Sequence, residues 1–144
     1  MALPTSIDLQ ILTPERMLVH AQVDEVEIPG VNGYFGVLPG HTPLLAALKV
    51  GELWYRIGQQ KTFVAIAYGF AEVLPDRVSI LARLAEKAEE IDIERAQAAH
   101  KRASERLQQP DVDFERAGVA LAKSITRLQV ASYIASGVSQ RPRV

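Results

Sequence analysis

Residues 52–67 have the sequence ELWYRIGQQKTFVAIA, in which two strand-like runs flank a short turn. In the first run the apolar residues Leu53, Tyr55 and Ile57 take every second position, as in a half-buried β-strand. A turn of three residues that begins at Gly58 separates this run from the second, which contains Phe, Val and Ile. Two such runs joined by so short a turn predict a β-hairpin.

The same alternation extends over the N-terminal part of the chain, from Ile7 to Leu84. Ile7, Leu9 and Ile11, for example, alternate with polar residues. Turn-forming sequences recur at Pro29-Gly30, Asn32-Gly33, Pro39-Gly40, Lys49 to Gly51 and Pro75-Asp76. Many short strands joined by tight turns predict an antiparallel β-sandwich, to which we assign residues 1–84.

The composition changes near Ala85, after which the good helix formers Ala, Glu, Arg, Lys and Gln dominate. A first helix is predicted from an N-cap at Asp92 to about Leu107, and Pro110 ends it. Its apolar stripe is mostly alanine and buries little area, so the helix needs a surface on which to dock.

A second helix is predicted to begin near Asp111 or Asp113. Its expected apolar face consists of Phe114, Ala117, Leu121, Ile125 and Leu128. We expect residues 85–144 to form an antiparallel two-helix hairpin with a frayed tail over residues 136–144. The predicted fold class is therefore α+β, with a mainly β N-terminal domain followed by this hairpin.

The bulk composition argues against several classes of function. Sixteen basic and seventeen acidic residues give a net charge of -1, which disfavours a general nucleic-acid binder. The chain has no cysteine, and no apolar run is long enough to span a membrane. His20, His41 and His100 lack the spacing of a metal site, and no nucleophile-elbow or phosphate-loop motif occurs. We therefore expect no metal and no autonomous catalytic site.

Charge is unevenly distributed along the second helix and the tail. After Glu115 the chain has no acidic residue, and the basic residues that follow are Arg116, Lys123, Arg127, Arg141 and Arg143. Late positive charges suit the negative end of a helix macrodipole, so a solvated helix explains them. A basic arm for an acidic partner is the alternative, and the pattern alone leaves both open.

The most distinctive segment is residues 24–45, whose four glycines and three prolines force tight turns. The run at residues 31–53 begins within it and has the sequence VNGYFGVLPGHTPLLAALKVGEL. It resembles the glycine-rich loop segment of F-type ATP synthase epsilon subunits. The resemblance covers nearly the whole chain, including GFAEV at residues 69–73, IDIERA at residues 91–96 and the end of the second helix at Arg127-Leu128. An ordered match of this length is far more specific than a short motif.

The resemblance implies a non-catalytic subunit of the central stalk, or rotor, of a bacterial proton-translocating ATP synthase. Its sandwich would dock on the gamma subunit and on the c-subunit ring, as a peripheral membrane protein at the cytoplasmic face of the inner membrane. Asn32, Gly33 and Tyr34 would face the c ring, and His41 would lie near gamma. Several relatives have an acidic residue in place of Tyr34, so aromatic packing would replace a charge contact.

The resemblance also implies two positions for the hairpin, which either folds on the sandwich or extends along gamma towards the alpha/beta catalytic head. The extended hairpin would oppose ATP hydrolysis. Arg116, Lys123 and Arg127 are the residues expected to make this inhibitory contact. Because the contact is electrostatic, salt is expected to weaken it.

Residues 91–96 match the ATP-binding pattern of the family, so the resemblance implies ATP as a regulatory ligand, with no cofactor required. The implied nucleotide-binding residues are Glu86, Ile91, Asp92, Arg95, Ala96, Arg102, Lys123 and Arg127. Lys123 stands where tight binders have arginine, and lysine lacks the bidentate fork. Helix capping by Asp92 and ordinary surface ion pairs are the alternative explanation.

Two functions of other classes stay open from the sequence. A free-standing β-domain sensor would use the hairpin as a nucleotide-gated lid and would have no rotary partner. A small enzyme would need convergent acid–base or metal groups that the sequence does not display. Co-purification with gamma discriminates the rotor subunit from the sensor.

Overall fold

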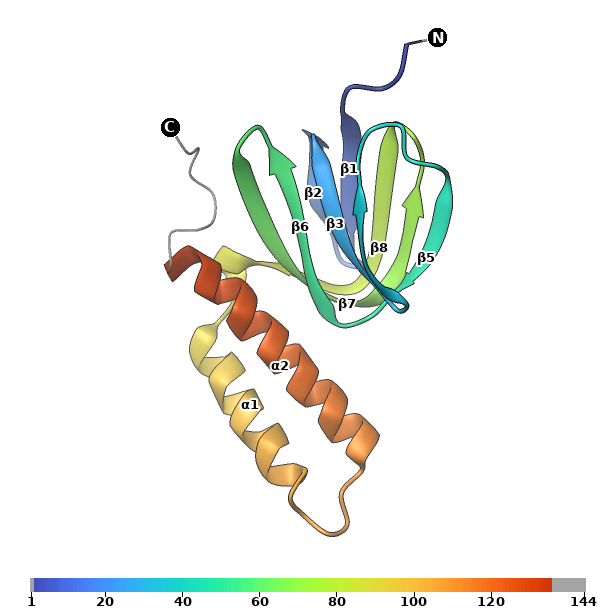
Figure 1. Ribbon diagram of the computed structural model, residues 1–144. Helices are drawn as coiled ribbons and strands as arrows, with labels where there is room; N and C mark the ends of the chain where they lie inside the picture. Colours follow the sequence, from blue (N-terminus) through green and yellow to red (C-terminus); the bar gives the residue numbers. More distant parts are fainter. Residues whose placement is uncertain (1, 136–144) are drawn as a thin grey trace.

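The computed structural model describes residues 2–135, which form eight strands followed by two α-helices (Figure 1). The strands are β1 (Ile7–Leu12), β2 (Met17–Val23), β3 (Glu25–Gly30), β4 (Gly33–Val37), β5 (Leu44–Leu48), β6 (Gly51–Ile57), β7 (Gln60–Val73) and β8 (Arg77–Lys87). A short 3-10 helix, η1 (Ala88–Glu90), leads into α1 (Ile93–Arg106) and α2 (Phe114–Ala135). The tail predicted to fray, with Arg141 and Arg143, lies outside the described residues.

The predicted sandwich followed by two helices is confirmed. The strands are hydrogen-bonded in the order β2-β1-β8-β7-β5-β3-β4, and β6 joins β3 to β7. The hairpin predicted in residues 52–67 is the β6–β7 pair, with Ile57 opposite Gln60. One pair departs from the antiparallel expectation, because β1 and β8 run parallel with Leu12 opposite Leu81. Parallel neighbours need a long connection, and here the rest of the sandwich connects the first strand to the last.

β7 belongs to both layers of the sandwich because it changes partner midway. It pairs with β6 as far as Ile66 and with β5 from Gly69 onwards. At this change Tyr68 and Gly69 have φ angles of 61° and 129°. A Cβ on Gly69 would overlap the carbonyl oxygen of Leu81, so only glycine fits there.

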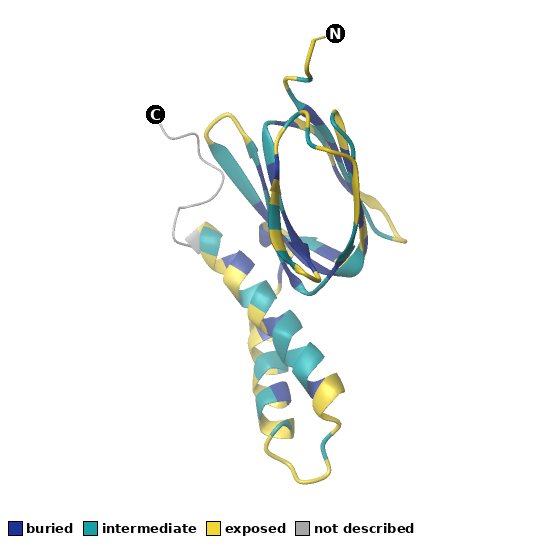
Figure 2. Cartoon of the chain, turned by 45° about the vertical axis from the view of Figure 1, so that its right-hand side comes forward, coloured by how far each residue is buried: buried dark blue, intermediate teal, exposed yellow. Residues whose placement is uncertain are grey.

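The main core lies between the two layers, where alternate side chains of each strand point inward. Ile7, Leu9 and Ile11 of β1 are fully buried, as the period-two pattern predicts. Figure 2 shows the buried residues on the inner sides of the strands and the exposed ones at the loops and the helix surfaces.

The helix starts are set by aspartate caps. Asp92 Oδ1 accepts a hydrogen bond from the Arg95 amide at 3.0 Å, which confirms the predicted N-cap of α1. Asp113 Oδ1 accepts from the Arg116 amide at 3.1 Å in the same way, so Asp113 rather than Asp111 caps α2. Both caps satisfy amide groups that would otherwise lack a partner at the helix start.

The apolar face predicted for α2 is partly wrong. α2 buries Ala117, Ser124, Val130 and Ala131. By contrast, Phe114 and Ile125 are 66% and 45% exposed. The helix packs on α1 along one side and on β6, β7 and η1 along another, so no single stripe describes its buried surface.

The hairpin docks on the sandwich through a second, smaller hydrophobic cluster. This docking cluster consists of Phe63, Ala65, Ala88, Ile91, Val130 and Ala131, with Trp54 and Tyr133 packed against it. Tyr133 stacks on Phe63 with ring centroids 3.9 Å apart, and its hydroxyl donates to Glu52 Oε1 at 3.0 Å. Burial and this hydrogen bond raise the pKa of Tyr133. One residue of α2 thus contacts both β6 and β7.

Candidate functional site

A polar cavity of about 340 Å³ lies where β8 and η1 meet the two helices. Its lining residues are Glu86, Glu90, Asp92, Arg95, Ala96, Ala99, Arg102 and Arg127. The volume is within the usual range for small-molecule sites, about 300–1,000 Å³. All the nucleotide-binding residues predicted from the sequence line this polar cavity, except Ile91 and Lys123.

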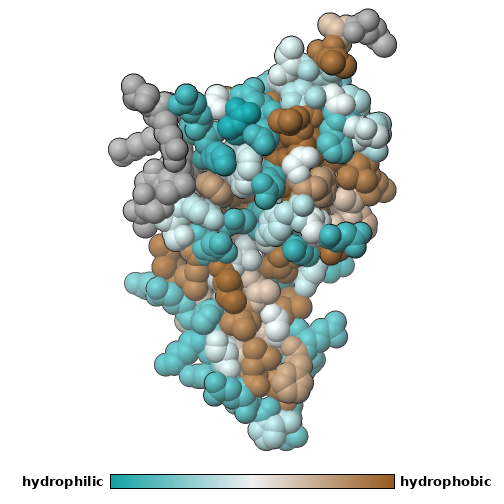
Figure 3. Space-filling view, viewed as in Figure 1, coloured by the Kyte–Doolittle hydropathy of each residue, from teal (hydrophilic) through white to brown (hydrophobic). Residues whose placement is uncertain are grey.

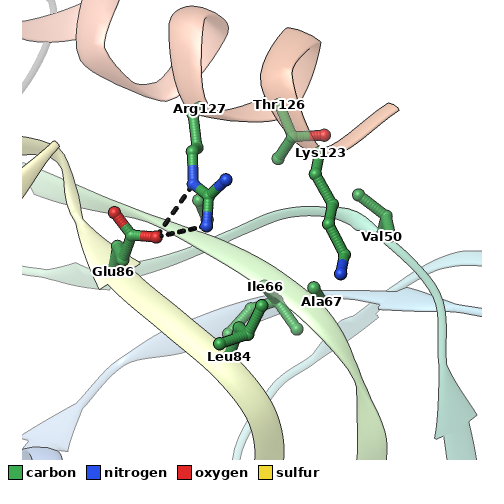
Figure 4. A pocket seen from close by; sticks show the side chains of 9 residues that line it. Val50, Ile66, Ala67, Leu84, Glu86, Lys123, Thr126 and Arg127 are labelled. Atoms are coloured by element: carbon green, nitrogen blue, oxygen red, sulfur yellow. Dashed lines mark hydrogen bonds and ion pairs between the residues drawn. The ribbon is translucent and has the colours of Figure 1, made fainter. Parts of the chain in front are cut away.

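An ion pair between α2 and β8 closes one side of the polar cavity. Arg127 Nε and Nη2 lie 2.8 and 2.7 Å from Glu86 Oε1 (Figure 4). Both side chains are partly shielded from water, which strengthens the attraction relative to a fully exposed pair. Because the two partners belong to the hairpin and the sandwich, this wall exists only while the hairpin is docked.

Two arginines of α1 supply positive charge to the polar cavity. Arg95 and Arg102 are two helical turns apart, so both side chains reach the same side of the helix. Within residues 2–135, neither guanidinium has an ion-pair partner. Unpaired guanidinium groups beside a partly enclosed cavity are suited to bind phosphate oxygens.

Two of the residues predicted for nucleotide binding lie elsewhere. Ile91 is 8% exposed and belongs to the docking cluster, so it supports the start of α1 instead of lining the polar cavity. Lys123 lines a smaller neighbouring hollow with Val50 and Leu84, as Figure 4 shows. Its Nζ lies 5.8 Å from the centroid of the Tyr68 ring. Ile91 and Lys123 therefore match the ATP-binding pattern in the sequence, but neither is part of the wall of the polar cavity.

Glu90 lines the polar cavity although the sequence did not identify it. It stands in an acidic segment that has no distinguishing pattern, so its position follows only from the fold. The Arg16 guanidinium, which hydrogen-bonds Glu90, holds the pKa of this carboxyl below its usual value.

The three residues predicted for the inhibitory contact are not grouped in this conformation. Arg116 is exposed in the first turn of α2, where it lines a hollow beside the helix–helix turn with Arg106. Lys123 and Arg127 are partly buried against the sandwich. Figure 3 shows apolar residues interspersed with polar ones along the hairpin, which is thus not a uniformly polar surface.

A second candidate site is a row of apolar side chains on the outer face of the sandwich. Strand register places Ala47 opposite Phe70, Phe70 opposite Leu81, Leu81 opposite Leu12, and Leu12 opposite Met17. This apolar row crosses five neighbouring strands. Phe70 and Leu81 are each 55% exposed, and a groove of about 430 Å³ runs beside them along Thr13 and Pro14. Exposed apolar groups in such a continuous line are typical of a protein-docking surface.

The loop residues predicted to contact the c ring form part of a third surface. Asn32, Gly33 and Tyr34 line a hollow of about 450 Å³ with Leu44 and Leu45 of β5. The Tyr34 hydroxyl accepts a hydrogen bond from the Glu52 amide at 3.2 Å, and Lys49 Nζ lies 4.7 Å from the centre of its ring. The aromatic side chain is therefore held in place, yet it is 46% exposed.

His41 lies apart from that turn. It follows the C-terminal end of β4, whereas Asn32 precedes the N-terminal end, so the two are at opposite ends of this strand. The neighbouring Gly40 amide donates to the Pro75 carbonyl at 2.7 Å, which ties the loop to the β7–β8 turn. His41 Nδ1 is 2.6 Å from the Thr42 carbonyl oxygen.

Residues 2–135 contain neither a metal-binding cluster nor a membrane-spanning helix. No group of three or more His, Asp and Glu side chains in this part of the chain is placed to hold a metal ion. Neither α1 nor α2 combines the length and hydropathy that a bilayer-spanning helix needs.

Comparison with known proteins assigns the chain to a family. Residues 6–88 match the family model for the β-sandwich domain of the ATP synthase delta/epsilon chain, and residues 89–132 match the model for its long α-helix domain. The chain belongs to the ATP synthase delta/epsilon family. The boundary between the two matched domains falls within η1.

Individual relatives agree with the family assignment. The chain is 54% identical over 127 residues to the ATP synthase epsilon chain of Syntrophobacter fumaroxidans, covering 87% of this chain and 95% of that one. It is 46% identical over 131 residues to the epsilon chain of Solibacter usitatus, covering 90% and 98%. A chain in the mitochondrial ATP synthase of Euglena gracilis, solved as an OSCP/F1/c-ring assembly, superposes with a TM-score of 0.70 at 25% identity, covering 96% of this chain and 84% of that one. The resemblance to epsilon subunits inferred from the sequence is confirmed.

Proposed function

We propose that this protein is a non-catalytic rotor subunit of the central stalk in a bacterial F-type ATP synthase. The observation that carries the proposal is the apolar row, exposed on a rigid sandwich in a chain of the epsilon family. A rotor subunit must transmit torque, so it needs a firm surface that stays attached to a partner. A face built on five hydrogen-bonded strands meets that need.

The apolar row is assigned to gamma. Phe70 and Leu81 stand side by side at its centre, and the groove beside them can accept an apolar side chain of the partner. Large apolar groups of this kind supply most of the binding energy at protein interfaces. The loop with His41 leads into β5, where Leu45 is on the same face as Ala47 and extends the apolar surface.

The β3–β4 turn is assigned to the c ring. Tyr34 is fixed by Glu52 and Lys49 and so loses little side-chain entropy on binding. Val31 beside it is 55% exposed and adds apolar area. Contact with the ring through this turn would make the protein a peripheral membrane protein at the cytoplasmic face of the inner membrane.

The hairpin is assigned a regulatory role with ATP as the ligand. Arg95, Arg102 and Arg127 line the polar cavity and can bind phosphate groups, while Asp92 can accept from the adenine amino group. ATP would stabilise the docked hairpin in proportion to its preference for that state. In the undocked state Lys123 and Arg127 would lose their contacts with the sandwich, and with Arg116 they would face the alpha/beta head and oppose hydrolysis.

Co-purification of the tagged full chain with gamma tests the rotor assignment. Recovery of gamma and the c ring supports it, and recovery of the chain alone would favour the free-standing sensor. ATP hydrolysis by the assembled enzyme tests the regulatory role. The Arg116→Ala variant changes an exposed residue outside the polar cavity and is expected to raise hydrolysis. An unchanged rate would count against the inhibitory contact while leaving the rotor assignment intact.

A further inference from the structure

An ion pair outside the polar cavity holds one of its walls. Arg16 Nη1 donates to Glu90 Oε1 at 2.9 Å, and Arg16 Nη2 donates to Glu90 Oε2 at 2.7 Å. This fork joins the β1–β2 turn to η1 across 74 positions of the sequence. A planar guanidinium that meets both oxygens fixes the carboxylate in orientation as well as in place.

The turn that carries Arg16 is itself rigid. The Thr13 amide donates to the Arg16 carbonyl at 2.9 Å, and the Arg16 amide lies 3.3 Å from Thr13 Oγ1. On the other side of the ion pair, Glu90 Oε2 accepts from the Lys87 amide at 3.2 Å. Glu90 is therefore held from two directions while its side chain still borders the polar cavity.

Glu90 is one of several charged residues that line the polar cavity, so its neutralisation changes the net charge of the site. Its acidic residues are Glu86, Glu90 and Asp92, and its basic residues are Arg95, Arg102 and Arg127. Glu86 and Arg127 neutralise each other directly. Without Arg16, the two remaining acids would offset the two remaining arginines, and a polyphosphate would gain little from the charge of the site.

We propose that Arg16 is a positioning residue for a nucleoside triphosphate in the polar cavity, acting by holding Glu90 and neutralising it from outside. With Glu90 neutralised, Arg95 and Arg102 outweigh Asp92, and the site favours a polyphosphate anion. The inference rests on the proposed binding of ATP and adds a determinant that lies on the sandwich, outside the helical segment that carries the ATP-binding pattern.

A merely structural role for the ion pair makes a different prediction. If Arg16 only kept η1 in place, removing the Glu90 charge as well would not restore the ATP affinity that is lost in Arg16→Gln. If Arg16 acts by neutralising Glu90, removing both charges restores binding. The double variant therefore separates the two explanations.

The test is calorimetric titration of the full-length chain with ATP at low salt. The variants are Arg16→Gln, Glu90→Gln, the double variant and a control, Arg77→Gln, which breaks the surface pair of Arg77 with Glu72 on the sandwich. Circular dichroism confirms that each is folded. We expect Arg16→Gln to weaken ATP binding about threefold to fivefold, the double variant to bind like Glu90→Gln, and Arg77→Gln to bind like the unmodified chain.

Each outcome decides the proposal. Unchanged affinity in Arg16→Gln, or a double variant as weak as Arg16→Gln, would overturn the role of Arg16 while the ATP site stands. Failure of the unmodified chain to bind ATP would overturn the nucleotide site, and the role of Arg16 with it.

Discussion

Replacement of Tyr133 by alanine is expected to weaken the docking of the hairpin on the sandwich without unfolding the sandwich. The side chain makes a ring stack with Phe63 at 3.9 Å and a hydrogen bond to Glu52 Oε1 at 3.0 Å. An aromatic pair contributes about 0.5–1.5 kcal/mol beyond burial, and a net hydrogen bond about 0.5–1.5 kcal/mol. Together these contributions predict a loss of about 2 kcal/mol in the free energy of docking.

The protein contains its own probe for this measurement. Trp54 is the single tryptophan of the chain and packs against the docking cluster, so its fluorescence reports whether α2 is in place. We expect the Tyr133→Ala variant to lose the docked Trp54 signal at a lower urea concentration than the unmodified chain. Circular dichroism of the strands follows the sandwich separately.

Tyr133→Phe is the matched control because it keeps the ring stack and removes only the hydroxyl. It leaves the Glu52 carboxylate without this donor, while Glu52 Oε2 is already buried with no hydrogen-bond partner among the described residues. We expect its effect to be about half that of Tyr133→Ala. Equal urea midpoints for all three proteins would refute the contribution assigned to Tyr133.

Three further predictions concern η1, the start of α1, and β7, the strand that is shared by the two layers. Because the folded-state pKa of Glu90 is lowered from its usual 4.5, the Arg16–Glu90 pair contributes stability above that pH and loses it as the pH falls through the lowered value. The difference in stability between the unmodified chain and Arg16→Gln is therefore expected to be present at pH 7 and to vanish in acid. A difference that is independent of pH in thermal melts would contradict this prediction. Asp92→Ala removes the N-cap of α1 and is expected to cost about 0.5–2 kcal/mol in urea unfolding, with Asp92→Asn nearly neutral as its control; equal losses in the two would refute a capping role. Gly69→Ala forces a Cβ against the Leu81 carbonyl at a positive φ, and we expect it to lower the free energy of unfolding by more than about 1 kcal/mol. Gly36→Ala, where a Cβ meets open space, serves as the control in the same melts.

Local patterns in the sequence were sufficient for the strands, the hairpin turn and the start of α1. The sequence predicts Asp92 as an N-cap because a short acceptor before a helix-forming run has few other roles. The resemblance to a family also brought together residues such as Glu86 and Arg127, which are 41 positions apart in the sequence and form an ion pair in the fold.

Features that depend on register or on two packing partners could not be predicted. The apolar row appears only when Phe70, Leu81 and Leu12 are aligned across three strands, and each alone is an ordinary surface residue. Ile125 fitted the helical stripe but is exposed, because α2 divides its buried surface between α1 and the sandwich. Glu90 lines the polar cavity and pairs with Arg16, 74 positions away in the sequence, and no local pattern indicates either contact.

Titration of gamma with the full-length chain and two surface variants tests the central claim most directly. Leu81→Arg places an unpaired charge in the middle of the apolar row, whereas the control Ile57→Arg changes a residue of similar exposure, 49% against 55%, at the end of β6. Neither is expected to change the free energy of unfolding by more than about 0.5 kcal/mol. We predict that Leu81→Arg weakens gamma binding at least about tenfold and that Ile57→Arg leaves it unchanged. Full-strength binding by Leu81→Arg would contradict the assignment of this face to the rotor partner.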